Sequence, residues 1–204
     1  MRSFSLALLS LLVPAAVLAQ PPPPPPGYGP PQPAYGEPQN LKNGLTFEAN
    51  LGVGYIWVES EGQDSDKEVA LGGLNIGIGG WLNPRMALSL RIAGVTYTDS
   101  QGDTDFRFTT GIMGPHLQYW LDDHFWLGGG AGIGVAAVSI DSPAGSDSDS
   151  ETGFGLDLRA GYTFSTGSEH TWNVSFELTP SFITIDTQDY TFYGAAVLFG
   201  YQHL

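Results

Sequence analysis

Long segments of alternating apolar and polar residues constrain this chain more than any other feature. From Leu45 to Trp57 the odd positions are apolar and the even positions polar or small until Gly54. The same two-residue period returns, with even positions apolar, from Phe154 to Phe164 and from Trp172 to Leu178. This period is typical of β-strands with one apolar face. Globular strands usually have about five or six residues, whereas a tilted strand needs about nine to eleven to cross a bilayer. The alternation therefore predicts transmembrane strands.

Polar connections divide this region into strands. Short turns are expected at residues 82–85, 121–124 and 165–170, and mostly longer acidic loops at residues 59–68, 99–105, 141–152 and 186–189. Three short turns alternating with four loops predict a closed, eight-stranded antiparallel up-and-down transmembrane β-barrel. We place this domain at residues 41–204, with both ends of the barrel on the short-turn side.

The polar faces of the predicted strands carry five charged residues, Glu48, Arg91, Asp157, Arg159 and Glu177. In a membrane barrel the polar faces line the interior, where an isolated charge is costly, so we expect these residues to form a paired network. A path for protons or ions is the alternative, but eight strands leave an interior only wide enough for side chains. We expect the inward glycines to leave room for these long side chains; they are Gly128, Gly130, Gly132 and Gly134.

Trp and Tyr collect at both membrane interfaces of such barrels. We expect interface girdles from Trp57, Tyr97, Trp81, Trp172 and Tyr201. Trp120 and Trp126 fall on the polar face by parity, and their orientation stays open. The apolar parity also changes across Gly114–Pro115, from Phe106, Phe108 and Ile112 to Leu117, Tyr119 and Leu121, which favours a β-bulge there.

The first forty residues predict export followed by a linker. Residues 1–19 contain Arg2, a short apolar core and small residues before Gln20, as in a signal peptide cleaved near Ala19. Residues 20–40 include the run Pro21–Pro26, which favours an extended periplasmic linker; a proline-recognition segment for a periplasmic partner is the alternative. The chain has no cysteine and a formal net charge of −14, which excludes disulfides and disfavours nucleic acid as a partner.

Metal and catalytic motifs are weak. Carboxylates stand at alternate positions, as in a calcium loop, at Asp147, Asp149 and Glu151. The residues that follow do not match the EF-hand pattern, so a solvated acidic loop is favoured. The four histidines are scattered, and neither a nucleophile elbow nor an H-E-x-x-H motif occurs. We therefore expect no cofactor and no enzymatic activity, a membrane-embedded lipid hydrolase or acyltransferase being the less favoured alternative.

Three segments resemble strands of a known family. Residues 114–123 and 126–132 are similar to the fourth and fifth strands, and residues 194–201 to the last strand, of small eight-stranded outer-membrane β-barrel domains, the class of OmpX-like and OmpW-like proteins. The resemblance implies the outer membrane of a Gram-negative-type bacterium, with membrane lipid and the barrel-assembly machinery as partners. Members typically end on an aromatic residue, whereas this chain continues to Gln202–Leu204.

The function expected from these features is that of a monomeric structural or surface-interaction protein whose barrel presents acidic loops to an extracellular ligand. One alternative is a narrow channel for small or hydrophobic solutes. Another is a secreted, soluble, lipocalin-like binding protein, in which the apolar faces would point inward.

Overall fold

The computed structural model describes residues 42–60, 63–64, 68–143, 145–165 and 169–204. The predicted signal peptide and proline-rich linker lie outside these residues. Among the described residues, no helix is long and apolar enough to cross a membrane.

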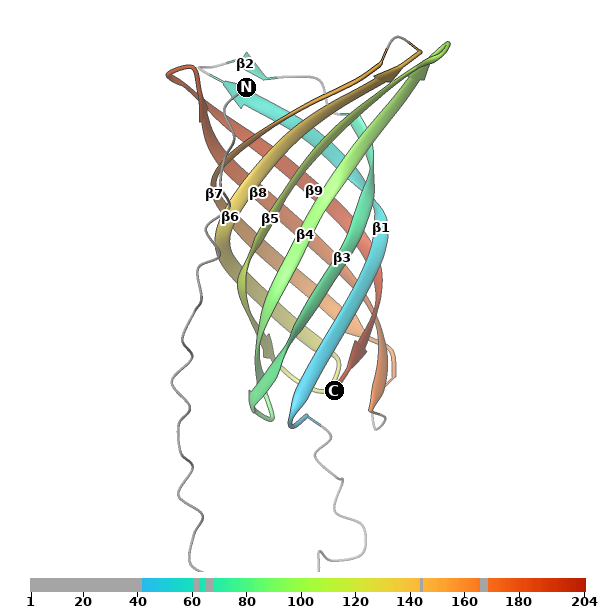
Figure 1. Cartoon of the computed structure of the whole chain (residues 1–204). Helices are drawn as coiled ribbons and strands as arrows, with labels where there is room; N and C mark the ends of the chain where they lie inside the picture. The colour runs from blue at the N-terminus through green and yellow to red at the C-terminus, as the bar shows by residue number, and fades with distance from the viewer. Residues whose placement is uncertain (1–41, 61–62, 65–67, 144, 166–168) are drawn as a thin grey trace, which may run out of the picture. The chain divides into compact units, whose positions relative to one another are not determined.

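Eight long antiparallel strands form a closed barrel, which confirms the predicted fold class (Figure 1). The strands are β1 (Leu45–Ser60), β3 (Glu68–Asn83), β4 (Met86–Gln101), β5 (Thr104–Trp120), β6 (Phe125–Ser142), β7 (Gly145–Thr163), β8 (His170–Ile185) and β9 (Gln188–His203). Each strand pairs with the next in this order, and β1 also pairs with β9, which closes the sheet. The two-residue strand β2 (Gln63–Asp64) pairs only with the end of β1.

The barrel has an apolar outer surface and a largely polar interior. On β1, Leu51 is 62% exposed while the adjacent Asn50 is 1% exposed. The neighbouring strand β3 repeats the pattern, with Ile78 61% and Asn75 1% exposed. This inversion of a soluble protein's arrangement suits a hydrocarbon solvent, in which a closed sheet pairs its backbone polar groups from strand to strand.

A bulge in β3 reverses the parity of that strand. Leu71 and Leu74 are both exposed although three positions separate them, and the pairing with β4 shifts between Gly72 and Ile76. At this break the side chain of Asn75 accepts a hydrogen bond from the backbone N–H of Gly94 at 3.0 Å. The extra residue of the bulge interrupts the pairing of β3 with β4, and the Asn75 side chain satisfies the backbone N–H of Gly94 instead.

The bulge predicted at Gly114–Pro115 does not occur. Strand β5 pairs with β4 in one register from Tyr119 to Thr104, so its parity never changes. Ile112 is buried inside the barrel, 5% exposed, and Phe108 packs in the lumen as well. The apolar parity misled the prediction because part of the lumen is itself apolar.

The barrel has two different ends. The turn end carries the first residue of β1, the last residue of β9 and the three short turns. In the β5–β6 turn, the Asp122 carboxylate accepts hydrogen bonds from the backbone N–H groups of Phe125 and His124, at 2.8 and 2.7 Å. These bonds lower the pKa of Asp122, the one from Phe125 most strongly.

At the opposite, loop end, the β4–β5, β6–β7 and β8–β9 connections are hairpins rather than long loops. The β4–β5 ladder continues to the pair Gln101–Thr104, and the β6–β7 ladder continues to Ser142–Gly145. Most of residues 99–105 and 141–152, which were expected as loops, are therefore strand. Alternating polar residues are compatible with a ladder that is exposed on both faces, so acidity alone did not distinguish loop from strand.

The tight β8–β9 turn offers a stability test. Its two central residues, Asp186 and Thr187, have φ angles of 48° and 74°. Such turns favour glycine at the second position, and a β-branched residue is strained there. We expect Thr187→Gly to raise the free energy of unfolding by about 1 kcal/mol, measured by urea titration in lipid vesicles. Thr98→Gly, in an exposed strand position, is the control and should lower it; a loss in both variants would contradict the strain.

Candidate functional site

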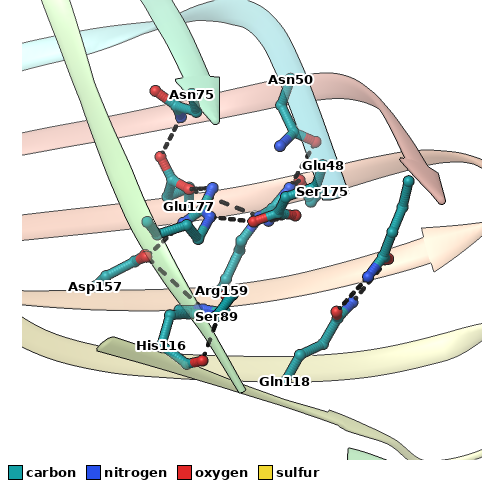
Figure 2. A network of polar contacts seen from close by, with 12 residues as sticks. Glu48, Asn50, Asn75, Ser89, His116, Gln118, Asp157, Arg159, Ser175 and Glu177 are labelled. Atoms are coloured by element: carbon teal, nitrogen blue, oxygen red, sulfur yellow. Dashed lines mark hydrogen bonds and ion pairs between the residues drawn. The ribbon is translucent and has the colours of Figure 1, made fainter. Parts of the chain in front are cut away.

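The lumen contains a buried group of ion pairs, the charge network, formed by Glu48, Arg91, Asp157, Arg159 and Glu177 (Figure 2). The Arg91 guanidinium from β4 contacts three carboxylates at once, those of Glu48 on β1, Asp157 on β7 and Glu177 on β8. Its Nη2 lies 2.6 Å from Oε2 of Glu177. The Arg91 side chain is only 2% exposed. Because β8 lies across the barrel from β4, the contact with Glu177 links opposite walls.

The second arginine completes the charge network. Arg159 Nη1 lies 2.6 Å from Oε2 of Glu48, and its Nη2 donates to Oδ1 of Asn50 at 2.7 Å. Ser175 accepts a further hydrogen bond from Nη2 at 3.1 Å. The guanidinium carbon also lies 4.7 Å from the ring centroid of Trp126, within the range of a cation–π interaction.

Residues that the sequence interpretation missed lie next to the charge network. Asn75 donates to Oε1 of Glu177 at 2.6 Å, and His116 Nε2 lies 3.7 Å from Oδ2 of Asp157. Three carboxylates against two guanidinium groups give a formal charge of −1 if His116 is neutral. The inward parity of His116 on β5, shared with Gln118, was the signal that would have placed it in the lumen.

Glycines create the space that these long side chains occupy. A methyl group at Gly77 would lie 2.9 Å from side-chain atoms of both Arg91 and Glu48. A methyl group at Gly128 would lie 2.5 Å from the ring of His116. Gly77 and Gly128 thus leave the space that the charged and bulky side chains occupy, as the sequence predicted for Gly128.

Below the charge network, indole rings close the turn end of the lumen. Trp120 and Trp126 are each 1% exposed and pack with Trp81 and the last residue, Leu204; we call this cluster the indole floor. Trp120 and Trp126, whose orientation the sequence left open, therefore both point inward. Trp81 was expected in an interface girdle but points inward too, because the β3 bulge shifts its parity.

A lysine covers the indole floor. Lys42 Nζ lies 3.6 Å from the ring centroid of Trp120, which is a cation–π distance. Burial lowers the pKa of this ammonium group, opposed by the carboxylates of Asp123 and Asp122.

The lumen toward the loop end is apolar. Buried Ile56, Val95 and Leu198 pack there with Tyr97 and Phe108. Tyr97, the second residue wrongly expected in a girdle, therefore lies inside the barrel. An inward tyrosine is stable here because the neighbouring side chains are aliphatic or aromatic.

The acidic segment considered for calcium does not converge on one point. Asp147, Asp149 and Glu151 lie along β7, where the register pairs them with Ile140, Val138 and Ala136 of β6. Side chains on one face of an extended strand point in parallel rather than toward a common centre. Within the described ranges, no group of three or more metal-liganding side chains is found.

Comparison with known protein families identifies the barrel. The family described as "Outer membrane protein beta-barrel domain" matches residues 5–202. The chain belongs to this family. It is therefore a protein of the outer membrane of a Gram-negative bacterium, and the apolar outer surface of the barrel faces lipid.

Solved structures of this architecture are similar in fold. Ail, the attachment invasion locus protein of Yersinia pestis, crystallised with the heparin analogue sucrose octasulfate, is 17% identical with a TM-score of 0.50, over 76% of this chain and 98% of that chain. Neisserial surface protein A is 11% identical with a TM-score of 0.54, over 78% and 96%. No curated protein sequence matches the chain. At these identities the likeness concerns the fold alone.

Aromatic residues on the outer face of this outer-membrane barrel contact one another in pairs. Trp172 contacts Tyr201 at 5.5 Å between ring centroids near the turn end, and Trp57 stacks on Tyr193 at 4.8 Å on the strands leading to the loop end. We expect these pairs to lie at the two membrane interfaces, since amphipathic rings prefer that depth.

Proposed function

We propose that this outer-membrane barrel is a membrane anchor that presents an acidic sheet for interaction with basic polypeptides at the cell surface. In this proposal the turn end faces the periplasm and the loop end faces the exterior, as is usual for barrels with short periplasmic turns.

One observation carries the proposal, namely that β4, β5, β6 and β7 extend past the neighbouring β3 and β8 at the loop end (Figure 1). The β6–β7 ladder reaches Ser142–Gly145, whereas the β7–β8 ladder begins only at Phe154–Phe182. Residues 145–153 of β7 are thus paired on one side only. We call β4–β7 beyond this point the projecting sheet. An unpaired edge offers backbone donors and acceptors to an added strand.

The charge of the projecting sheet favours a basic partner. Its described residues include Asp99, Asp103, Asp105, Asp141, Asp147, Asp149 and Glu151, against Arg107 as the one basic residue. The free edge itself reads Ser-Asp-Ser-Asp-Ser-Glu from residue 146 to residue 151. Complementary charge raises association rates and suppresses wrong partners. A polysulfated ligand such as the one bound to Ail would be repelled by this surface.

The interior supports an anchor rather than a pore. The charge network spans the lumen between opposite walls, and the indole floor lies beneath it with its two central rings 1% exposed. Eight-stranded barrels have an interior that side chains can fill. We therefore favour the anchor over the narrow channel, and the apolar exterior disfavours a soluble, lipocalin-like protein.

Binding of a synthetic oligolysine tests the proposal. With the protein in zwitterionic lipid nanodiscs, we expect an oligolysine peptide to bind more tightly than oligoglutamate and than the same oligolysine with N-methylated backbone amides. Asp147→Asn with Asp149→Asn should weaken oligolysine binding about fivefold, because each exposed ion pair contributes up to about 1 kcal/mol. Biolayer interferometry over a range of salt concentrations measures both effects.

A matched control removes the same charge from the other end of the barrel. Asp123→Asn with Glu169→Gln should leave oligolysine binding unchanged. Equal losses in the two double variants, or equal binding of the N-methylated peptide, would contradict strand addition at β7. Discrete conductance steps in planar bilayers would contradict the sealed anchor.

A further inference from the structure

A cavity of about 570 Å³ opens on the inner face of the projecting sheet. It is distinct from the free edge of β7, because the residues that line it belong to β4, β5 and β6: Tyr97, Asp99, Gln101, Thr104, Phe106 and Ile140. Small-molecule sites typically have volumes of about 300–1,000 Å³. The cavity is therefore large enough for a small organic ligand.

The strand register makes this lining one continuous surface. Asp99 on β4 lies opposite Phe106 on β5, and Phe106 lies opposite Ile140 on β6. The three side chains thus form a row across three adjacent strands. Tyr97 packs edge-on against Phe106, with ring centroids 6.3 Å apart and an interplanar angle of 61°. An aromatic corner and an aliphatic side chain therefore stand in one row with the Asp99 carboxylate, and Asp147 on β7 follows Ile140 in the same row.

Exposed apolar surface distinguishes this cavity from an ordinary acidic hairpin. Ile140 is 43% exposed although it lies above the apolar part of the lumen, where Phe108 and Phe192 pack at 5.9 Å between ring centroids. The cavity thus continues an apolar lining toward solvent. An apolar ligand body would cover this surface, and its burial would contribute roughly 25 cal/mol for each Å² removed from water.

The carboxylate in this surface has no cationic partner in the described chain. Oδ2 of Asp99 accepts a hydrogen bond from Gln101 Nε2 at 3.0 Å, and none of the ion pairs among the described residues includes Asp99. Arg107 follows Phe106 on β5, so its side chain projects from the opposite face of the sheet. The negative charge beside the aromatic corner is therefore left for a ligand.

We propose that this cavity binds a small organic cation with an apolar body, such as an arylalkylammonium ion. The ammonium group pairs with Asp99, and the apolar body lies against Phe106 and Ile140. The ring faces of Tyr97 and Phe106 add cation–π attraction for the same charge. The proposal does not rest on the proposed strand addition, since that uses the backbone edge of β7 and this site uses side chains of β4–β6.

Three ligands of similar size and different charge test the site. We expect phenethylamine to bind the protein in zwitterionic nanodiscs more tightly than phenethyl alcohol, and hydrocinnamate to bind weakest. Isothermal titration calorimetry against empty nanodiscs measures the affinities, and NMR of backbone amides locates the contact. Asp99→Asn should weaken phenethylamine binding about tenfold and leave phenethyl alcohol unchanged, because only the charged hydrogen bond is lost.

Asp105→Asn is the matched control. Asp105 lies on the next strand and carries the same charge, but its parity places it on the opposite face, where Ser100 donates to it at 2.6 Å. Full phenethylamine affinity in this variant, with amide shifts around residues 97, 106 and 140, would support the site. Equal losses in Asp99→Asn and Asp105→Asn, or equal affinity for amine and alcohol, would overturn it. Asp147 lies opposite Ile140 on the same face of the sheet, so Asp147→Asn is tested as well; a loss of phenethylamine affinity as large as that in Asp99→Asn would overturn the assignment of the charge to Asp99.

Discussion

Replacing Arg91 by methionine is expected to lower the free energy of unfolding of the barrel by about 3–5 kcal/mol. The Arg91 guanidinium is the common partner of Glu48, Asp157 and Glu177, and all four side chains are buried. Methionine fills much of the volume but leaves three carboxylates with Arg159 as their remaining cation. The large effect comes from these uncompensated charges rather than from a cavity.

Unfolding by urea in lipid vesicles, followed by tryptophan fluorescence, measures this loss. Adding Asp157→Asn to Arg91→Met should recover part of the stability, since it removes one of the uncompensated charges. The double-mutant cycle gives the coupling between the two residues. Arg107→Met, at an exposed position on β5, should change stability by no more than about 0.5 kcal/mol.

The opposite result would be equally informative. If Arg91→Met lost no more stability than Arg107→Met, the charge network would not hold the walls of the barrel together. Water or ions would then have to enter the lumen freely, and the proposed anchor would lose its main support.

Gly161→Ala is expected to cost about 2–3 kcal/mol through overpacking of the indole floor. Gly161 on β7 lies directly opposite Trp126 on β6, and an added methyl carbon would lie 2.1 Å from Cζ2 of the indole. Trp126 has little freedom to move, because Trp120 packs on one side and the Arg159 guanidinium lies over its ring. The added methyl group would therefore strain both the indole floor and the charge network.

Gly129→Ala is the matched control for this substitution. Gly129 faces outward from β6, and a methyl group there would lie 3.7 Å from the nearest neighbouring atom, the carbonyl oxygen of Asp157. We expect the same urea titration to give wild-type stability for this variant. Similar losses in the two variants would show that glycine is needed for backbone reasons and not for space beside Trp126.

Strand number and the direction of the charged residues followed from the sequence. A period of two fixes which residues share a face, so Glu48 on β1, Asp157 and Arg159 on β7 and Glu177 on β8 were assigned inward from their apolar neighbours. Their pairing partners did not follow, because contacts across a lumen join residues far apart in the chain. Arg91 meets Asp157, on β7, only when the sheet has closed.

Hydrophobicity identified the outward face less well where the interior is apolar. Tyr97, Phe106 and Ile112 are apolar or aromatic and yet point inward, since the lumen near the loop end is packed with similar side chains. Trp81 was misplaced for a different reason. The bulge in β3 inserts one residue and exchanges the inward and outward positions in the rest of that strand, including Trp81.

The apolar–polar alternation and the polar connections between its segments together determined an eight-stranded barrel with lipid outside, because both are local properties of the chain. Tertiary structure alone decided what fills and extends that barrel. Closure of the sheet brings five charges to one level of the lumen, and the unequal lengths of the β6–β7 and β7–β8 ladders expose the edge of β7. Both depend on the register between strands, which is set by packing across the whole barrel rather than by the residues of any one strand.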